Sequence, residues 1–218
     1  MTREDIFKTV DHTLLAQTAT WEEIKEICDD AIKYQTASVC IPASYVKRAK
    51  DYVDGKMAIC TVIGFPLGYN CRESKIFEAR QALAHGADEL DMVIDLGAVH
   101  EGRWADVAEE ISSIKQVSAV HVLKVIIETC YLSEAEKRTI CQLFPATGAD
   151  FLKTSTGFGS AGAQLEDIRL FRSLLPPQVK LKAAGGIRTR EEMEAFLLAG
   201  CDRLGCSAGV KALYGEEE

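Results

Sequence analysis

Two runs of the chain, AICTVIG at residues 58–64 and LKVIIE at residues 123–128, decide the fold class. Both are apolar over most of their length, where a half-exposed strand would alternate apolar and polar residues. A uniformly apolar strand is covered on both faces, which is typical of parallel strands in α/β proteins. The rest of the chain should therefore alternate such strands with amphipathic helices.

Short apolar runs recur along the whole chain, with helical patterns between them. Local signals mark the helix ends: Thr20 with Glu23 and Thr189 with Glu192 form capping-box patterns, and Gly86 ends the helical pattern before it. The predicted strands cover residues 9–12, 37–41, 57–64, 89–94, 121–128, 150–154, 180–184 and 203–206.

Eight strands that alternate with helices, without an interdomain linker, predict a single-domain (β/α)8 TIM barrel over residues 1–218. The last residues, 215–218, read as a frayed tail. A doubly wound open sheet is the alternative. It is disfavoured by the number of strands and by the lack of an early GxGxxG turn.

The net charge of −8 argues against a nucleic-acid partner and against an anionic membrane surface. A local site can still oppose the global sign, so an anionic small substrate remains open. No apolar run approaches the roughly 18 residues that a membrane span requires. The N-terminus has no apolar signal region either, and we expect a cytoplasmic protein.

The eight cysteines form no CxxC pair, and most of them lie inside apolar runs such as ASVCIP and LGCSAG. Cysteine in such a setting behaves as a small hydrophobic residue, so reduced thiols are expected. The four histidines show no ligand spacing relative to these cysteines. We therefore expect no zinc site, and we expect no cofactor.

Active sites of TIM barrels lie at the C-terminal ends of the strands. Asp91 falls inside its apolar strand, where an ionised carboxylate needs a cationic partner. Asp11 has a simpler interpretation as a turn cap, and Glu128 is better explained as an N-cap or ion-pair residue. The polar or reactive residues at the predicted strand ends are Asp11, Cys40, Asp91, Asp95, Glu128, Lys153, Lys182 and Ser207.

Two lysines end apolar strands: Lys153 in FLKTSTGF and Lys182 in VKLKAAGG. Desolvation disfavours a buried ammonium group, and a second ammonium nearby disfavours it further. The neutral amine that results can attack a carbonyl carbon and form a Schiff base. The alternative is that both lysines extend to solvent or form structural ion pairs.

Gly185 and Gly186 follow the strand of Lys182, while Gly205 and Ser207 lie at the end of the last strand. In TIM barrels the loops after strands seven and eight often bind phosphate. Backbone N–H groups that glycine leaves exposed suit a dianion. Together these loops predict a phosphorylated substrate.

Eight stretches, in this order, resemble the deoxyribose-phosphate aldolase family over nearly the whole chain. They are DHTLL (11–15), ASVCIP (37–42), VIGFPLG (62–68), ELDMVIDLGA (89–98), LKVIIET (123–129), LKTSTGF (152–158), KAAGGIRT (182–189) and LGCSAG (204–209). The resemblance implies a class I aldolase without metal. Such an enzyme reversibly cleaves 2-deoxy-D-ribose 5-phosphate to D-glyceraldehyde 3-phosphate and acetaldehyde.

The resemblance also implies a role for each matching residue. Lys153 would be the Schiff-base lysine, with Asp91 and Lys182 as its proton donor and acceptor residues. Residues that match positions around the substrate are Asp11, Cys40 and Thr156, and those that match the phosphate loops are Gly185, Gly186, Gly205 and Ser207.

Other functions remain open on the residues alone. One is a different Schiff-base aldolase or a transaldolase acting on another sugar phosphate. The other is a barrel that only binds a phosphorylated ligand. Because symmetric self-association is common, we expect a homo-oligomer, either a dimer or a tetramer.

Overall fold

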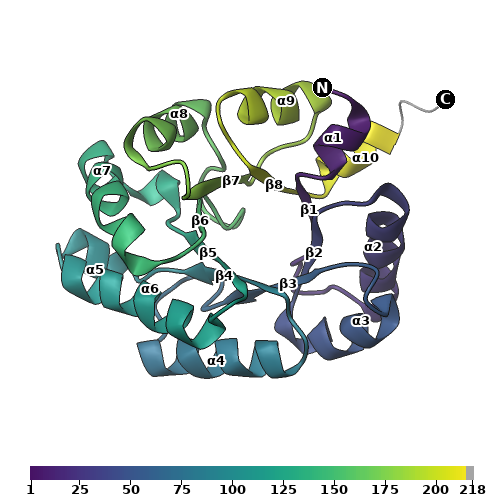
Figure 1. The fold of residues 1–218 in the computed structure, drawn as a ribbon, viewed down its shortest axis with the longest axis horizontal. Coiled ribbons are helices and arrows are strands. Elements are labelled where there is room, and N and C mark those ends of the chain that lie inside the picture. Colours follow the sequence, from purple (N-terminus) through teal and green to yellow (C-terminus); the bar gives the residue numbers. More distant parts are fainter. Residues whose placement is uncertain (215–218) are drawn as a thin grey trace.

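Eight parallel strands close into one barrel in the computed structural model, and helices surround it (Figure 1). The structure describes residues 1–214, so the predicted tail at 215–218 lies outside the described residues. Strand β1 pairs with both β2 and β8, which closes the sheet. The prediction of a (β/α)8 barrel is confirmed, and the open-sheet alternative is wrong.

All eight predicted strands are confirmed, and their ends differ from the predicted ends by at most two residues. They are β1 Val10–Thr13, β2 Ser38–Ile41, β3 Ile59–Ile63, β4 Glu89–Val93, β5 Val122–Ile126, β6 Phe151–Lys153, β7 Lys180–Ala184 and β8 Arg203–Cys206.

The helices occupy the intervals between strands. The capping boxes of Thr20 with Glu23 and of Thr189 with Glu192 are confirmed. The helices are α1 Arg3–Phe7, α2 Trp21–Tyr34, α3 Val46–Val53, α4 Arg72–Ala84, α5 Leu96–His100, α6 Trp104–Ser118, α7 Glu134–Leu143, α8 Leu165–Leu174, α9 Arg190–Leu198 and α10 Ala208–Tyr214, with 3₁₀ turns at Ala43–Tyr45, Thr129–Tyr131 and Phe144–Thr147. No helix in the described part of the chain is long and apolar enough to cross a membrane.

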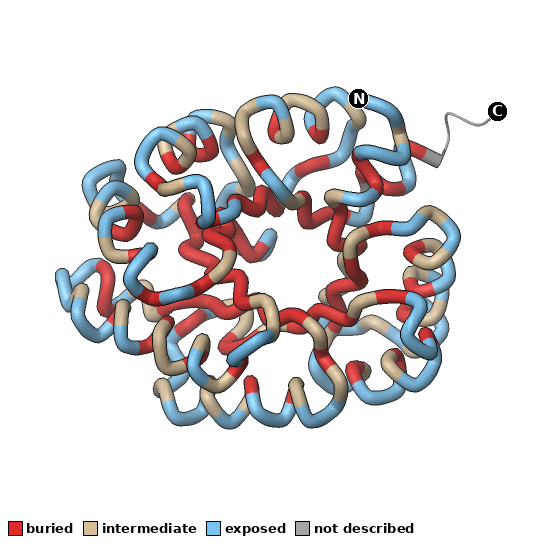
Figure 2. The backbone as a smooth tube through the Cα atoms, in the orientation of Figure 1, coloured by how far each residue is buried: buried red, intermediate tan, exposed pale blue. Residues whose placement is uncertain are grey.

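Buried residues follow the strands and the inner faces of the helices (Figure 2). Leu90 and Met92 alternate with Glu89 and Asp91 along β4, and all four are buried. The apolar residues belong to the core cluster, whereas the two acidic residues bind basic side chains inside the barrel. Both faces of the strand are therefore covered, but its inner face is charged.

A buried ion pair outside the barrel holds the end of β4. Lys75 on α4 lies 2.5 Å from Glu110 Oε1 on α6, and its Nζ donates to the backbone carbonyl of Val93 at 2.9 Å. Glu110 Oε2 accepts from the backbone N–H of Asp95 at 3.1 Å. Gly64, at φ +62°, makes room for this lysine, because a Cβ there would lie 2.8 Å from Lys75 Cε.

His12 lies on β1 with its side chain fully buried, and its Nε2 is 3.7 Å from Asp30 Oδ2. Burial lowers the pKa of His12 below its ordinary value, although the carboxylate of Asp30 opposes this shift. The folded chain therefore takes up this proton at a lower pH than the unfolded chain does.

We expect this difference to make the free energy of unfolding fall as the pH decreases through about 6.5, the ordinary pKa of histidine. Between about pH 7.5 and about pH 5.5, His12→Gln should lose about 1 kcal/mol less stability than the wild type. Urea unfolding at both values measures the difference. His85→Gln, at an exposed position, is the matched control and should behave as the wild type. Equal losses in all three proteins would contradict the prediction.

Candidate active site

Asp91 on β4 lies at the centre of a charged cluster inside the barrel. Its Oδ2 accepts from Lys153 Nζ on β6 at 2.7 Å and from Lys182 Nζ on β7 at 2.7 Å. Lys153 and Lys182 are register partners in neighbouring strands, which brings their amines to the same level. Asp91 and Lys182 are fully buried, whereas Lys153 is 3% exposed. The structure thus brings together the three residues that the resemblance made catalytic.

A third lysine in the cluster, Lys124 on β5, was missed from the sequence. Its Nζ lies 2.8 Å from Asp91 Oδ1, 2.6 Å from Glu89 Oε2 and 3.3 Å from Asp11 Oδ2. It is the only charged residue in the apolar interior of LKVIIE, as Asp91 is in LDMVI. The reasoning that singled out Asp91 applied equally to Lys124 and could have found it.

Asp11 on β1 belongs to the same cluster. It forms ion pairs with Lys182 and with Arg203 on β8, and its Oδ1 accepts from the Ser38 hydroxyl at 2.7 Å. Asp11 is fully buried inside the barrel. The interpretation of Asp11 as a turn cap is therefore wrong.

The pKa values of these groups move in the direction that keeps the cluster charged. Burial alone would raise the pKa of Asp91, but the ammonium groups of Lys124, Lys153 and Lys182 hold it well below its ordinary value. Burial alone would lower the pKa of Lys182, but Asp11 and Asp91 raise it above its ordinary value. Asp91 is therefore a carboxylate, and Lys182 is an ammonium group, at neutral pH.

A cavity of about 310 Å³ opens above the cluster, with Lys153 in its wall. Gly185 shapes it: its φ is +85°, and a Cβ on Gly162 would lie 2.1 Å from the Gly185 carbonyl oxygen. Neither position has room for another residue. The lining residues are Thr13, Leu15, Lys153, Thr156, Gly157, Ala184, Gly185, Gly186, Ile187, Arg188, Gly205, Cys206 and Ser207.

The cavity separates the predicted site residues into two groups. Lys153, Thr156 and the four phosphate-loop candidates line it, whereas Asp11, Cys40, Asp91 and Lys182 are fully buried and do not line it. Arg188 also lines the cavity and was missed from the sequence, because a single arginine in a loop is indistinguishable from an ordinary surface charge.

Glu128 and Asp95 lie outside the charged cluster and make other contacts. Glu128 precedes the 3₁₀ turn Thr129–Tyr131 but makes no side-chain cap bond, so the N-cap interpretation is wrong. Its carboxylate accepts from the backbone N–H of Thr156 at 3.2 Å and from the hydroxyl of the same residue. Asp95 caps α5 by accepting from the Gly97 N–H at 2.9 Å.

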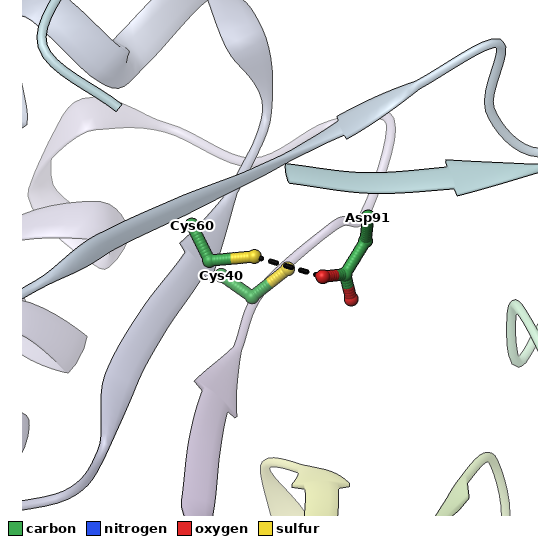
Figure 3. Close-up of side chains that lie close together, drawn as sticks. All are labelled: Cys40, Cys60 and Asp91. Carbon is green, nitrogen blue, oxygen red and sulfur yellow. Dashed lines mark hydrogen bonds between the residues drawn. The ribbon is translucent and has the colours of Figure 1, made fainter. Parts of the chain in front are cut away.

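Two thiols, those of Cys40 and Cys60, lie next to Asp91 (Figure 3). Cys60 Sγ donates to Asp91 Oδ1 at 3.2 Å and accepts from Lys124 Nζ at 3.2 Å. Cys40 is the register partner of Cys60 on the neighbouring strand β2. The eight cysteines of the chain are free in the structure.

A model of the DeoC/LacD family of aldolases matches residues 6–205. The deoxyribose-phosphate aldolase of Clostridium botulinum (strain Alaska E43 / Type E3) is 54% identical over 217 residues, covering 100% of this chain and 98% of the relative. That of Streptococcus pyogenes serotype M4 (strain MGAS10750) is 54% identical over 213 residues, covering 98% and 96%.

Solved structures agree with these sequence matches. The aldolase QR15 superposes with a TM-score of 0.93 at 37% identity, covering 97% of this chain and 96% of that one. The deoxyribose phosphate aldolase from Aeropyrum pernix superposes with a TM-score of 0.91 at 31% identity, covering 100% and 93%. The fold, the lysine cluster and the similarity to these proteins together define an aldolase built on a (β/α)8 barrel. The chain belongs to the DeoC/LacD family of aldolases.

We expect Lys124→Met to impair both activity and stability. The change removes one of the cationic partners of Asp91 and one of those of Glu89 inside the barrel, and breaking a buried ion pair costs about 3–5 kcal/mol. Urea unfolding and turnover of deoxyribose 5-phosphate measure the two effects. Lys180→Met, at an exposed position on β7, is the matched control and should change the free energy of unfolding by less than about 1 kcal/mol. Equal effects of the two substitutions would argue against this role for Lys124.

Proposed function

We propose that the chain reversibly cleaves 2-deoxy-D-ribose 5-phosphate to D-glyceraldehyde 3-phosphate and acetaldehyde, through a Schiff base on Lys153. The observation that carries the proposal is the position of this amine, in the cavity wall and 2.7 Å from Asp91 Oδ2. Relatives at 54% identity are named for the same activity. The proposed reaction uses neither metal nor cofactor.

The charges inside the barrel support a neutral amine. The cluster holds one more basic side chain than carboxylates, so one amine can lose its proton while every carboxylate keeps a cationic partner. Lys182 stays charged because its pKa is raised, and Lys153 is the amine that a substrate in the cavity can reach. We therefore assign the attack on the substrate aldehyde to Lys153. The basic side chains are Lys124, Lys153, Lys182 and Arg203, and the carboxylates are Asp11, Glu89 and Asp91.

Cleavage then follows from the position of Asp91 between the two amines. Lys153 attacks the aldehyde carbon of the open-chain sugar, and loss of water gives an imine that becomes protonated and withdraws electrons. Asp91 accepts the proton of the 3-hydroxyl, and the bond between C2 and C3 breaks to give an enamine. Lys182 supplies the proton that this enamine takes up at carbon. Hydrolysis of the imine releases acetaldehyde and restores Lys153.

We assign the substrate phosphate to the cavity wall away from Asp91. Backbone N–H groups of glycine loops bind anions, and the guanidinium group of Arg188 adds a positive charge. Thr156, held by Glu128, lies in the same wall and would contact the sugar. In the proposal, Asp11 and Cys40 lie inside the barrel, outside the cavity wall, and support the charged cluster. The loop residues in this wall are Gly185, Gly186, Gly205 and Ser207.

The proposal extends to assembly and location. The structure of the relative from Aeropyrum pernix is described as tetrameric, and we propose a homo-oligomer for this chain as well. Eight free cysteines suit a reducing compartment, which supports the cytoplasm as its location.

Incubation with acetaldehyde and borohydride should leave an ethyl group on Lys153, because borohydride reduces the imine to a stable amine. Intact-mass measurement and peptide mapping detect the group. Lys153→Arg keeps a positive charge but cannot form the imine, so it should lose the adduct and all measurable turnover. An ethyl group on another lysine, or turnover in the arginine variant, would remove Lys153 from this role.

Arg188→Gln should raise the KM for deoxyribose 5-phosphate about tenfold, because one charge-assisted contact with the phosphate is lost. With unphosphorylated deoxyribose, which lacks that contact, the same variant should match the wild type. Arg169→Gln, at an exposed position on α8, is the matched control and should leave both KM values unchanged. A rise in KM for both sugars would place the effect of Arg188 elsewhere than at the phosphate.

A further inference from the structure

Cys40 and Cys60 form a pair of thiols inside the barrel. They are register partners on the parallel strands β2 and β3, and both are fully buried. Their sulfur atoms and the nearest oxygen of Asp91 all lie within 4.8 Å of one another (Figure 3). Neighbouring strands are about 4.8 Å apart, which falls within the range of Cα separations of about 4.4–6.8 Å that a disulfide spans.

We propose that Cys40 and Cys60 are an oxidation site, at which a hydroperoxide converts the two thiols into a disulfide and reversibly inactivates the site. The inference rests on the pairing of the two strands and on the contact between Cys60 and Asp91. It concerns a modification that the cleavage reaction neither uses nor requires.

A small oxidant can reach the pair from the cavity. Cys40 is also the register partner of Thr13 on β1, and Thr13 lines the cavity. Asp91, which Cys60 contacts, binds Lys153 in the same cavity. Each thiol is therefore next to a residue that lines the cavity or contacts its wall, and hydrogen peroxide has only two heavy atoms.

The two thiols differ in acidity. Hydrogen bonding with Cys60 lowers the pKa of Cys40 below its ordinary value, whereas burial raises the pKa of Cys60 well above it. Cys40 is therefore the thiol that reacts first. Its thiolate attacks the peroxide oxygen, the O–O bond breaks, and the leaving alkoxide or hydroxide takes up a proton to give an alcohol or water.

The second step consumes the sulfenic acid formed on Cys40. Cys60 attacks the sulfur of this group, the S–O bond breaks, and the oxygen leaves as water with the Cys60 proton. Two thiols and one hydroperoxide thus give one disulfide, one alcohol or water from the hydroperoxide, and one further water. The two cysteines together lose two electrons, which the peroxide gains.

The disulfide removes the S–H group that donates to Asp91 Oδ1 at 3.2 Å. Asp91 then keeps its ammonium partners but loses a donor on the side facing β3. A lost hydrogen bond to a charged group changes a rate by about tenfold to about a hundredfold when the group acts in the reaction. We expect a loss of turnover in this range, which reduction reverses.

Cys40, Cys60 and Asp91 lie close enough together to ligate a metal ion, but the charges nearby disfavour it. The ammonium group of Lys124 lies 3.2 Å from Cys60 Sγ and 2.8 Å from Asp91 Oδ1, so it already occupies the cation position. Burial lowers the pKa of Lys124, yet Asp11 and Asp91 raise it well above its ordinary value, which keeps the group charged. A metal ion would have to displace this ammonium group, whereas oxidation of the two thiols would not.

The test is to treat the full chain with hydrogen peroxide, remove the oxidant, and alkylate the denatured protein with iodoacetamide. One disulfide leaves six alkylated cysteines where the untreated chain has eight. Peptide mapping should find a cross-linked peptide that contains Cys40 and Cys60. Turnover, measured in parallel, should fall as this peptide forms and return with dithiothreitol. The alkylation readout does not depend on the proposed activity.

Matched variants separate this pair from the other thiols. Cys60→Ala cannot form the disulfide, so whatever turnover it retains should show no loss that dithiothreitol reverses. Cys141→Ala, in the outer layer on α7, should respond to peroxide as the wild type does. The proposal is overturned if Cys40 and Cys60 are both alkylated after turnover has fallen, or if the cross-linked peptide forms without a loss of turnover. The wild-type peptide map decides the question even where Cys60→Ala does not fold.

Discussion

The carboxylate of Asp91 is the group on which the interior of this barrel depends. An ionised carboxylate away from water costs several kcal/mol, and attraction to buried cations offsets that cost only when the geometry is good. Here Lys124, Lys153 and Lys182 reach the carboxylate from three neighbouring strands at 2.7–2.8 Å. The charges therefore specify the strand register. A slip of β5 by one residue would turn Lys124 away from Asp91 and into the apolar layer beneath the helices.

Stability and chemistry are consequently divided between the two faces of each strand. The outward residues, such as Leu90 on β4 and Leu123 on β5, form the apolar core with the helices. The inward residues carry the charges and are expensive to bury, so they serve function more than stability. Lys75 and Glu110 connect the two layers, because their ion pair lies among the helices yet binds the backbone at the end of β4. The end of β4, just beyond Asp91, is thus held by contacts on both faces.

What could be predicted from the sequence was determined by local interactions. The strands, the capping boxes of α2 and α9, and the barrel itself follow from patterns within a few residues, and all were predicted. The ion-pair partners of the residues inside the barrel were not predicted, because these pairs depend on closure of the sheet. Asp11 and Arg203 are 192 residues apart, and only the pairing of β1 with β8 brings them together. Lys124 could have been singled out as Asp91 was, as one charge inside an apolar strand, but its partners on β1 and β4 become visible only in the closed barrel.

The net charge of the molecule and the charges near its cavity have opposite effects on a sugar phosphate. A net charge of −8 would repel a sugar phosphate at long range, but the screening length at physiological ionic strength is about 8 Å. Within that distance, Arg188 and the glycine loops line the cavity, and the cluster holds more basic groups than carboxylates. That surplus has two consequences. In the proposed reaction it lets one amine of the cluster lose its proton and act as the nucleophile, and it keeps Asp91 ionised. The surplus of basic groups makes the barrel interior electrostatically costly, and the proposed reaction depends on that surplus.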